Sequence, residues 1–380
     1  MRIGDFCKTN LYTYSEKEKW SEIHYLDTGN VTRGKITEIQ ILIPGIDTIP
    51  SRARRKVQVN DIIYSTVRPN QRHYGIIKSH NPNMLVSTGF VVITVDQQIA
   101  DPDFMYYFLT QDDVVETLEA IGEQSTSAYP SIKPVDIENL EIELPPLDEQ
   151  KKISSVLKTI DDKISTNQKI NDNLEQQVMA LFRSWFVDYS PFGGTMPLDW
   201  NISSLGEATE MGAGGDKPKI TSPTKTGECP FPIFSNGLSD CGLYGYTNEA
   251  KIYAESVTVS ARGTIGFVCL RHVPYVPIVR LVTLIPKCEL MSAKYLYLYL
   301  RQLNISGTGT TQQQLTVPDF RKTEIVIPNK DTMTVFTELI TPIFEKMWAN
   351  EGENDSLAKI RDTLLPKLMC GKIDVSAIKF

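Results

Sequence analysis

The feature that most constrains this chain is an internal repeat. Residues 131–146, SIKPVDIENLEIELPP, align with residues 314–329, QLTVPDFRKTEIVIPN, which is a shift of 183 along the 380-residue chain. The match continues beyond these segments without a gap, and it places Asp136 on Asp319. Self-similarity at a fixed spacing indicates a duplicated structural unit. The chain is therefore expected to contain two copies of one domain.

The joint within each copy indicates how that unit is built. In the first copy, residues 139–144 alternate apolar and acidic side chains, as a half-exposed strand does. Pro145 and Pro146 end this strand, and Asp148 is placed to cap the long helix-prone segment that follows. The sequence therefore predicts an α+β fold of two similar domains, each followed by a long helix.

Both predicted helices carry an apolar stripe with alternating spacings of four and three residues, which is typical of a coiled coil. Asparagine interrupts the two stripes at matching places, Asn167 and Asn171 in the first helix and Asn350 and Asn354 in the second. A buried asparagine fixes register, because a shift would leave its amide unpaired in an apolar layer. We therefore expect the helices to pair as an antiparallel coiled coil with the domains at opposite ends. The alternative is that each helix packs on its own domain and exposes its asparagines.

The repeat also sets the predicted boundaries. A helix of about forty residues spans on the order of 60 Å, so the helix pair would act as a rigid spacer between the two domains. We expect a first domain at 1–146, a first spacer helix at 147–188, a linker at 189–200, a second domain at 201–328, a second spacer helix at 329–368 and a C-terminal tail at 369–380.

Charge is distributed unevenly along the chain. The formal net charge is −7, which by itself argues against a nucleic-acid partner. Residues 51–80, however, contain seven basic residues and one acidic residue, whereas residues 101–149 contain thirteen acidic residues and one lysine. Either run is compatible with a solvated face, but the basic run also predicts a surface for phosphates.

Motifs for catalysis are absent from the sequence. There is no G-x-x-x-x-G-K-[ST] phosphate-binding loop, and no Asn/Asp-Pro-Pro-aromatic signature of amino-methyltransferases. The six cysteines and four histidines show no metal-ligand spacing, so we predict no catalytic, metal or cofactor site in this chain. No apolar run is long enough for a membrane span or a signal peptide, which favours the cytoplasm.

Two loops in the first domain are the strongest candidates for DNA contacts. The segment VRPNQRHYG (67–75) offers forked donors and acceptors on a turn stiffened by proline, as base reading requires, although a plain polar loop remains the alternative. The segment SRARRK (51–56) is better suited to phosphates, since flexible cations confer affinity without sequence preference. The candidates are Arg68, Asn70, Gln71 and Arg72 for bases, and Arg52, Arg54, Arg55 and Lys56 for phosphates.

A polar loop precedes the repeated strand in each half and extends the candidate set. These loops, GEQSTSAYPSIK and SGTGTTQQQLT, are rich in neutral donors. Arg262 in SARGTIG (260–266) occupies the position that the Arg68 loop holds in the first half. For SNGLSDCGLYGY (235–246), a groove loop and a plain hairpin are equally favoured. The loop candidates are Gln124, Ser125, Thr126, Ser127 and Tyr129 in the first half, and Thr308, Thr310, Thr311, Gln312, Gln313 and Gln314 in the second.

Over nearly its whole length the chain resembles the specificity subunit of Type I restriction-modification enzymes. The first domain departs from the pattern, because it lacks the tryptophan-containing lead-in that the second domain has at 197–200. The resemblance is carried by the duplicated domain, by LPPLDEQKKISSVLKTIDDKI, by LFRSWFVDYSPF (181–192), by MPLDWNISSLGEATEMGAGG (196–215) and by LLPKLMCGKIDV (364–375).

The resemblance implies a function that composition and spacing do not show. Such subunits bind double-stranded DNA at a bipartite target, one half-site per domain, with the helices setting the gap. They also bind two methyltransferase subunits, which carry S-adenosylmethionine and methylate adenine, and the complex can recruit restriction subunits that use ATP and Mg. For docking these subunits we consider the acidic region and the helix-end residues Leu181, Phe182, Trp185 and Phe186.

We thus expect a non-catalytic DNA-recognition and scaffold subunit. The competing interpretation is a structural adaptor whose repeated domains bind protein, with the acidic surface as the contact. Salt-dependent retention on DNA separates the two, because phosphate contacts weaken steeply as salt rises.

Overall fold

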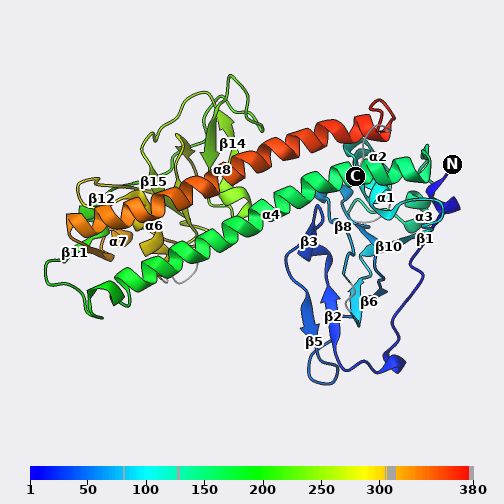
Figure 1. Ribbon diagram of the computed structural model, residues 1–380, viewed down its shortest axis with the longest axis horizontal. Helices are drawn as coiled ribbons and strands as arrows, with labels where there is room; N and C mark the ends of the chain where they lie inside the picture. Colours follow the sequence, from blue (N-terminus) through cyan, green and yellow to red (C-terminus); the bar gives the residue numbers. More distant parts are fainter. Residues whose placement is uncertain (80–81, 126–128, 304, 306–313, 376–380) are drawn as a thin grey trace. The chain divides into compact units, whose positions relative to one another are not determined.

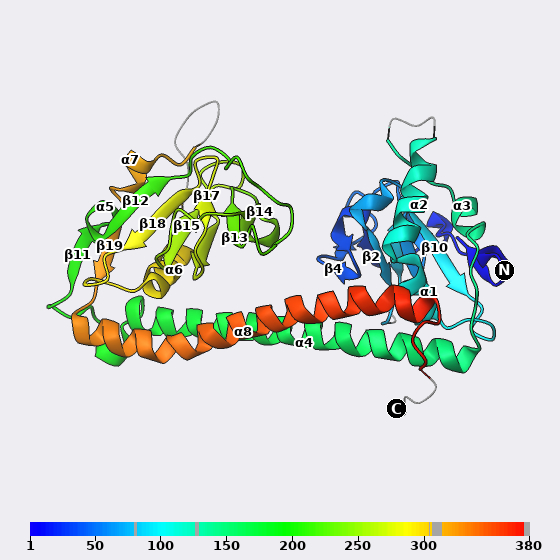
Figure 2. The same ribbon diagram turned by 90° about the horizontal axis from the view of Figure 1, so that it is seen from above.

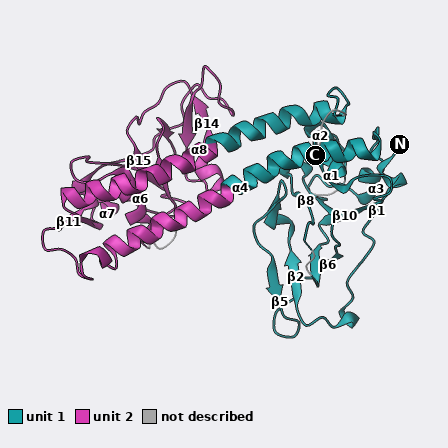
Figure 3. Cartoon of the chain, in the orientation of Figure 1, with its two compact units in different colours: residues 1–167, 352–380 teal, residues 168–351 magenta. Residues whose placement is uncertain are grey.

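The computed structural model divides the chain into two compact units (Figures 1 and 3). Unit 1 contains residues 1–167 and 352–380, and unit 2 contains residues 168–351. The structure describes residues 1–79, 82–125, 129–303, 305 and 314–375. Each unit therefore holds one α+β domain together with a segment of each of the two long helices.

Unit 1 is built on two four-stranded sheets. The main sheet has the order β1-β10-β7-β8 and is antiparallel throughout. The second sheet has the order β5-β2-β9-β6, in which β2 and β9 run parallel. The strands are β1 (Cys7–Thr9), β2 (Ile23–Leu26), β3 (Val31–Thr32), β4 (Lys35–Ile36), β5 (Gln40–Leu42), β6 (Ala53–Lys56), β7 (Ile62–Ser65), β8 (Tyr74–Ile76), β9 (Met84–Ser87) and β10 (Phe90–Val95).

Short helices lie before, between and after the strands of unit 1 along the chain. The apolar residues of α1, such as Phe104 and Met105, are buried with the inner face of the main sheet in one core. These helices are η1 (Ile3–Asp5), η2 (Glu16–Glu18), η3 (Thr28–Asn30), η4 (Pro69–Gln71), α1 (Pro102–Leu109), α2 (Asp112–Glu123) and α3 (Pro134–Glu138).

Unit 2 repeats this architecture. Its main sheet, β12-β18-β15-β16, is again antiparallel, and its second sheet, β14-β13-β17, again contains a parallel pair. The elements are η5 (Ser190–Phe192), β11 (Asn201–Ser204), α5 (Leu205–Ala208), β12 (Thr209–Ala213), β13 (Phe231–Phe234), η6 (Ser239–Gly242), β14 (Leu243–Thr247), β15 (Ser256–Val259), β16 (Val268–Arg271), β17 (Val276–Pro277), β18 (Val282–Pro286), α6 (Ala293–Gln302), α7 (Val317–Phe320) and β19 (Glu324–Ile327).

The main sheets of the two units have the same strand order. In sequence order, β1, β7, β8 and β10 take the same places in their sheet as β12, β15, β16 and β18 take in theirs. The parallel pair of β2 and β9 likewise corresponds to that of β13 and β17. The α+β fold with two similar domains, predicted from the repeat, is confirmed.

One long helix follows each domain in sequence. The two helices are α4 (Leu147–Phe186) and α8 (Lys330–Met369). In unit 1, Ile153 and Leu157 of α4 and Leu365 and Leu368 of α8 are buried in the domain core. In unit 2 the same is true of Val178 on α4 and of several residues of α8. Figure 2 shows that in each unit the strands lie on one side of the helix pair.

Contacts within each unit show that the paired helix segments run antiparallel. In unit 1, Asp161 accepts a hydrogen bond from Arg361 at 2.7 Å, and Asn167 donates to Asn354 at 2.9 Å. Residue numbers therefore rise along α4 as they fall along α8. In unit 2, Asn350 donates to the side chain of Asn171 at 2.7 Å, and Asn171 donates to the carbonyl of Met347 at 3.0 Å.

These bonds confirm the predicted pairing of the asparagines and exclude the alternative in which they are exposed. Asn167 and Asn350, which the repeat aligns with each other, are both 1% exposed. Each bonds to the half-buried asparagine of the other helix, Asn354 or Asn171. A buried amide is stabilised only when its donors and acceptors are satisfied, and a shift of register would break these bonds.

Two local predictions were wrong. Residues 139–144 do not form a strand, because only Met1 and Arg2 lie opposite: Arg2 bridges Glu141, and the amide of Ile142 donates to Met1. In unit 2 the equivalent β19 pairs with all four residues of β11. Asp148 is not the helix cap, since α4 begins one residue earlier, at Leu147. Its carboxylate instead lies in the first turn, where it interacts favourably with the helix dipole.

Candidate nucleic-acid interface

In unit 1 the predicted DNA-contacting loop at 67–75 lies against the end of the polar loop that precedes α3. The loop between β7 and β8 is bonded to the segment before α3, because the amide of Arg68 donates to the carbonyl of Pro130 at 2.9 Å and the amide of Ile132 donates to Thr66 at 2.8 Å. Val67 also forms a β-bridge with Ser131. The backbone of the two loops therefore forms one continuous platform.

Arg68 is held on this platform by its side chain as well. Its guanidinium lies over the ring of Tyr129, with 4.6 Å between the guanidinium carbon and the ring centroid. The backbones of Arg68 and Arg72 are left-handed, with φ of 49° and 57°, a conformation that costs a residue with a side chain on the order of 1 kcal/mol. Pro69 between them is buried, and the turn it starts is η4. Such a constrained turn fixes the direction in which its side chains project.

Helix α2 anchors η4 through two carboxylates that sequence reasoning missed. Asp112 forms an ion pair with Arg72 at 2.7 Å, and Glu119 accepts a hydrogen bond from the amide of Asn70 at 3.0 Å. Two residues of the acidic run at 101–149 thus hold the basic loop at 67–75 in place. Arg72, predicted to read bases, is engaged with α2, whereas the side chains of Asn70 and Gln71 are exposed.

The predicted phosphate clamp is partly neutralised in this structure. Arg54 pairs with Glu16 at 2.8 Å, and Lys56 pairs with Glu18 and lowers the pKa of that carboxyl through their hydrogen bond. Arg55 is half-buried, and desolvation lowers its pKa, whereas Arg52 is exposed. Ion pairs of this exposed kind contribute about 0–1 kcal/mol, so a phosphate could replace the carboxylates at small cost.

Unit 2 brings the equivalent residues together. Arg262 lies three residues after the end of β15, as Arg68 lies three residues after the end of β7. The amide of Leu315 donates to the carbonyl of Ala261 at 3.0 Å, which joins the two loops as in unit 1. The Nε and Nη2 atoms of Arg262 donate to the Oε1 atom of Gln314 at 3.1 and 3.0 Å.

The segment 235–246 forms the β13–β14 hairpin and also supports the Arg262 loop. The side chain of Asn236 accepts from the amide of Ala261 at 2.8 Å and donates to the carbonyl of Val279 at 2.7 Å. Strands β13 and β14 pair antiparallel, as in a hairpin, and the loop between them lies beside the loop that carries Arg262.

The remaining loop candidates are placed only in part. Gln124 is exposed at the end of α2, and Ser125 is half-buried and accepts a hydrogen bond from Ser131 at 3.4 Å. The other loop candidates lie outside the described residues: Thr126, Ser127, Thr308, Thr310, Thr311, Gln312 and Gln313.

Four residues assigned to partner docking lie instead in or against the core of unit 2. Phe182 and Phe186 are 1% and 5% exposed and contact Phe336 of α8, with ring centroids 6.2 and 4.6 Å apart. Leu181 and Trp185 are half-buried against the same core. The buried stripe at this end of α4 follows a spacing of four because the helix packs on the sheet domain as well as on α8. The prediction that Phe182 and Phe186 dock a partner subunit is therefore wrong, because both side chains are buried.

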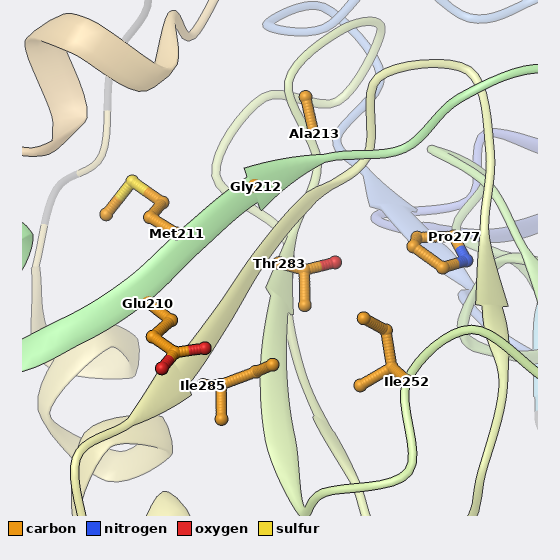
Figure 4. A pocket seen from close by; sticks show the side chains of 8 residues that line it. All are labelled: Glu210, Met211, Gly212, Ala213, Ile252, Pro277, Thr283 and Ile285. Carbon is orange, nitrogen blue, oxygen red and sulfur yellow. The ribbon is translucent and has the colours of Figure 1, made fainter.

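No small-molecule site emerges from the described part of the chain. A recess of ≈ 260 Å³ lies beside β12 and β18 in unit 2 (Figure 4), below the usual size of ligand pockets. The carboxylate of Glu210 and the hydroxyl of Thr283 do not converge there. Another recess, of ≈ 330 Å³, is lined by four residues of α8 alone, so it lies along the surface of one helix: Lys359, Ile360, Thr363 and Leu364. The described residues contain no cluster of metal ligands, and none of their helices is long and apolar enough to cross a membrane.

Comparison with known proteins decides the family. The model of the Type I restriction modification DNA specificity domain matches residues 1–176 and 197–359, once for each repeat. The chain belongs to this family. Its curated relatives are specificity subunits of Type I restriction enzymes.

Members of the specificity-domain family resemble the chain over most of its length. The HindI specificity subunit of Haemophilus influenzae is 25% identical over 98% of this chain and 98% of that protein. The MjaIX specificity subunit of Methanocaldococcus jannaschii is 26% identical over 73% of this chain and 70% of that protein. The crystal structure of a Type I restriction-modification S subunit from M. genitalium shares the fold, with a TM-score of 0.57 and 16% identity over 97% of this chain and 95% of that one.

Proposed function

We propose that this protein is the DNA-recognition subunit of a Type I restriction-modification complex, and that it reads a bipartite target with one half-site per unit. The observation that carries the proposal is the repetition of one loop platform. In both units an arginine three residues beyond a strand of the main sheet lies against the segment before a short helix. Two equivalent platforms suit two short DNA sequences.

The same proposal assigns the remaining work to partner subunits. Two methyltransferase subunits would carry S-adenosylmethionine, and restriction subunits, where present, would bring ATP and Mg. The complex would act in the cytoplasm, where its DNA is. The paired helices α4 and α8 would hold the two readers at a fixed gap, since their register is specified by buried asparagines.

Adenine methylation across a genome tests the proposal. Cells that express the partner methyltransferase from the same source are compared with and without this chain. We expect a bipartite motif with a fixed gap that appears only when the chain is present. If an active methyltransferase produced no such motif with the chain, the proposal would be wrong and a protein-binding adaptor would be favoured.

A further inference from the structure

Arg68 and Arg262 differ from other basic residues of the candidate interface in what holds them. Arg54, Lys56 and Arg72 are paired with carboxylates, which neutralise them. Arg262 is held by a neutral amide, and Arg68 by an aromatic ring. Neither contact brings a carboxylate to the guanidinium, and both restrict its orientation.

The contact between Arg262 and Gln314 leaves one edge of the guanidinium available. A guanidinium presents five N–H donors in a rigid plane, and two of its edges can bind a pair of acceptors. Gln314 takes the edge formed by Nε and Nη2. The other edge, formed by Nη1 and Nη2, makes no hydrogen bond within the described residues, and Arg262 is exposed.

In unit 1 the contact between Arg68 and Tyr129 has the same consequence. The guanidinium carbon lies over the ring, 4.6 Å from its centroid, and a cation–π contact of this kind uses none of the N–H donors of Arg68. Tyr129 comes from the segment before α3, as Gln314 comes from the segment before α7. Each arginine is therefore oriented by the segment that precedes the repeated short helix.

We propose that Arg68 and Arg262 each read one guanine in the major groove, and that Tyr129 and Gln314 are the positioning residues that orient them. Guanine presents O6 and N7 as a pair of acceptors that matches the free edge of arginine. A phosphate contact needs only a cation within reach, whereas base reading needs a fixed orientation. The inference rests on the proposed function and names the base class that each half-site contains.

Methylation mapping with variants of unit 2 tests the assignment. The motif of the wild-type protein should contain a guanine that the Arg262→Ala variant no longer requires. At that position alone, the preference of the variant for guanine over the other bases should fall by about 5- to 150-fold. Gln314→Ala should relax the same position by about 2- to 10-fold, since it removes one group that orients the guanidinium. Gln314→Glu keeps the acceptor that orients Arg262 but adds a negative charge, so it should weaken binding to DNA while the guanine preference remains. The exposed Gln177 on α4 supplies the matched control, and Gln177→Ala should leave the motif unchanged.

Variants of unit 1 test the assignment independently in the other half-site. Arg68→Ala should relax a guanine there, Tyr129→Leu should relax the same position, and Tyr129→Phe should preserve it because the ring remains. If Arg262→Ala or Arg68→Ala abolishes methylation, Arg→Lys at the same position keeps the charge and removes the fork, and should relax the guanine. Binding of the purified complex to duplexes substituted one base pair at a time gives a second reading.

Several results would overturn the inference while leaving the proposed function intact. A bipartite motif without guanine in either half would do so, as would an unchanged motif with uniformly weaker methylation in the arginine variants, which indicates phosphate contacts. Relaxation at different positions in Arg262→Ala and Gln314→Ala would also contradict it. Failure of the wild-type chain to direct any motif would instead contradict the proposed function.

Discussion

At the residue scale, the asparagines of the long helices have the most definite energetic role. Asn350 is buried, and its amide donates to Asn171, whose own amide donates to the carbonyl of Met347. A polar group left unpaired in such a layer costs about 1–3 kcal/mol, whereas replacing both partners by apolar groups can be neutral. The pair should therefore matter more for register than for stability.

A double-mutant cycle tests this role. Asn171→Leu alone should lower the free energy of unfolding by about 1–3 kcal/mol, because it leaves the amide of Asn350 unpaired. The double variant with Asn350→Leu should be less destabilised than the sum of the singles. Chemical denaturation of the purified chain measures all three, with the exposed Asn173→Leu as control. Additive effects of the two single changes would show that the residues do not act as a pair.

At the element scale, the C-terminal end of α4 belongs to the core of unit 2. Phe182→Ala should lower the free energy of unfolding by about 3–5 kcal/mol, since the ring is buried among Phe186, Tyr295 and Phe336. Val187→Ala, an exposed apolar position just beyond the helix, is the matched control. Unchanged stability of Phe182→Ala, together with weakened methyltransferase binding, would restore the docking role that the burial of Phe182 contradicts.

Strand β6 with the turn before it makes a separate prediction about salt. Replacing Arg52, Arg54 and Lys56 by glutamine should weaken binding of the complex to all DNA sequences and lower the salt slope of log K by roughly 1 for each phosphate that the variant no longer binds. The methylation motif should stay the same. Titration of the complex at several salt concentrations measures the slope, with Lys158→Gln on α4 as control. A changed motif would mean that these residues read bases.

The elements also show which predictions the sequence supports. The long helices were predictable because a stripe of apolar residues and its asparagines recur along each helix. The strand at 139–144 was not, since a strand needs a partner and only Met1 and Arg2 lie opposite. Near its C-terminal end α4 buries Phe182 and Phe186 because it packs against the domain of unit 2. The spacing of apolar residues along the helix does not reveal this contact.

In the candidate site, too, some features were predictable from the sequence and others were not. The equivalence of the Arg68 and Arg262 loops followed from the repeat and matches their place after β7 and β15. The partners of Arg54 and Arg72 did not, because Glu16 and Asp112 are distant in sequence and meet them only in the folded domain. Ion pairs of this kind leave no periodic signal in a single sequence.

At the scale of the whole molecule, the units are not consecutive pieces of chain. Each contains one domain and a segment of both α4 and α8, so the C-terminal residues of the chain complete the unit that its N-terminus begins. Leu365 and Leu368 are buried in the core of unit 1 together with Ile153 and Leu157. An exchange of one recognition domain should therefore leave residues 352–375 in place, so that the helix pairing within unit 1 is retained.

Such an exchange tests the central claim most directly, namely that each unit reads its own half of a bipartite target. Residues 1–146 are replaced by the corresponding segment of another specificity subunit, and adenine methylation is mapped in cells that contain the partner methyltransferase. The account predicts that one half of the motif changes while the other half and the gap stay the same. A change in both halves, or in neither, would contradict it.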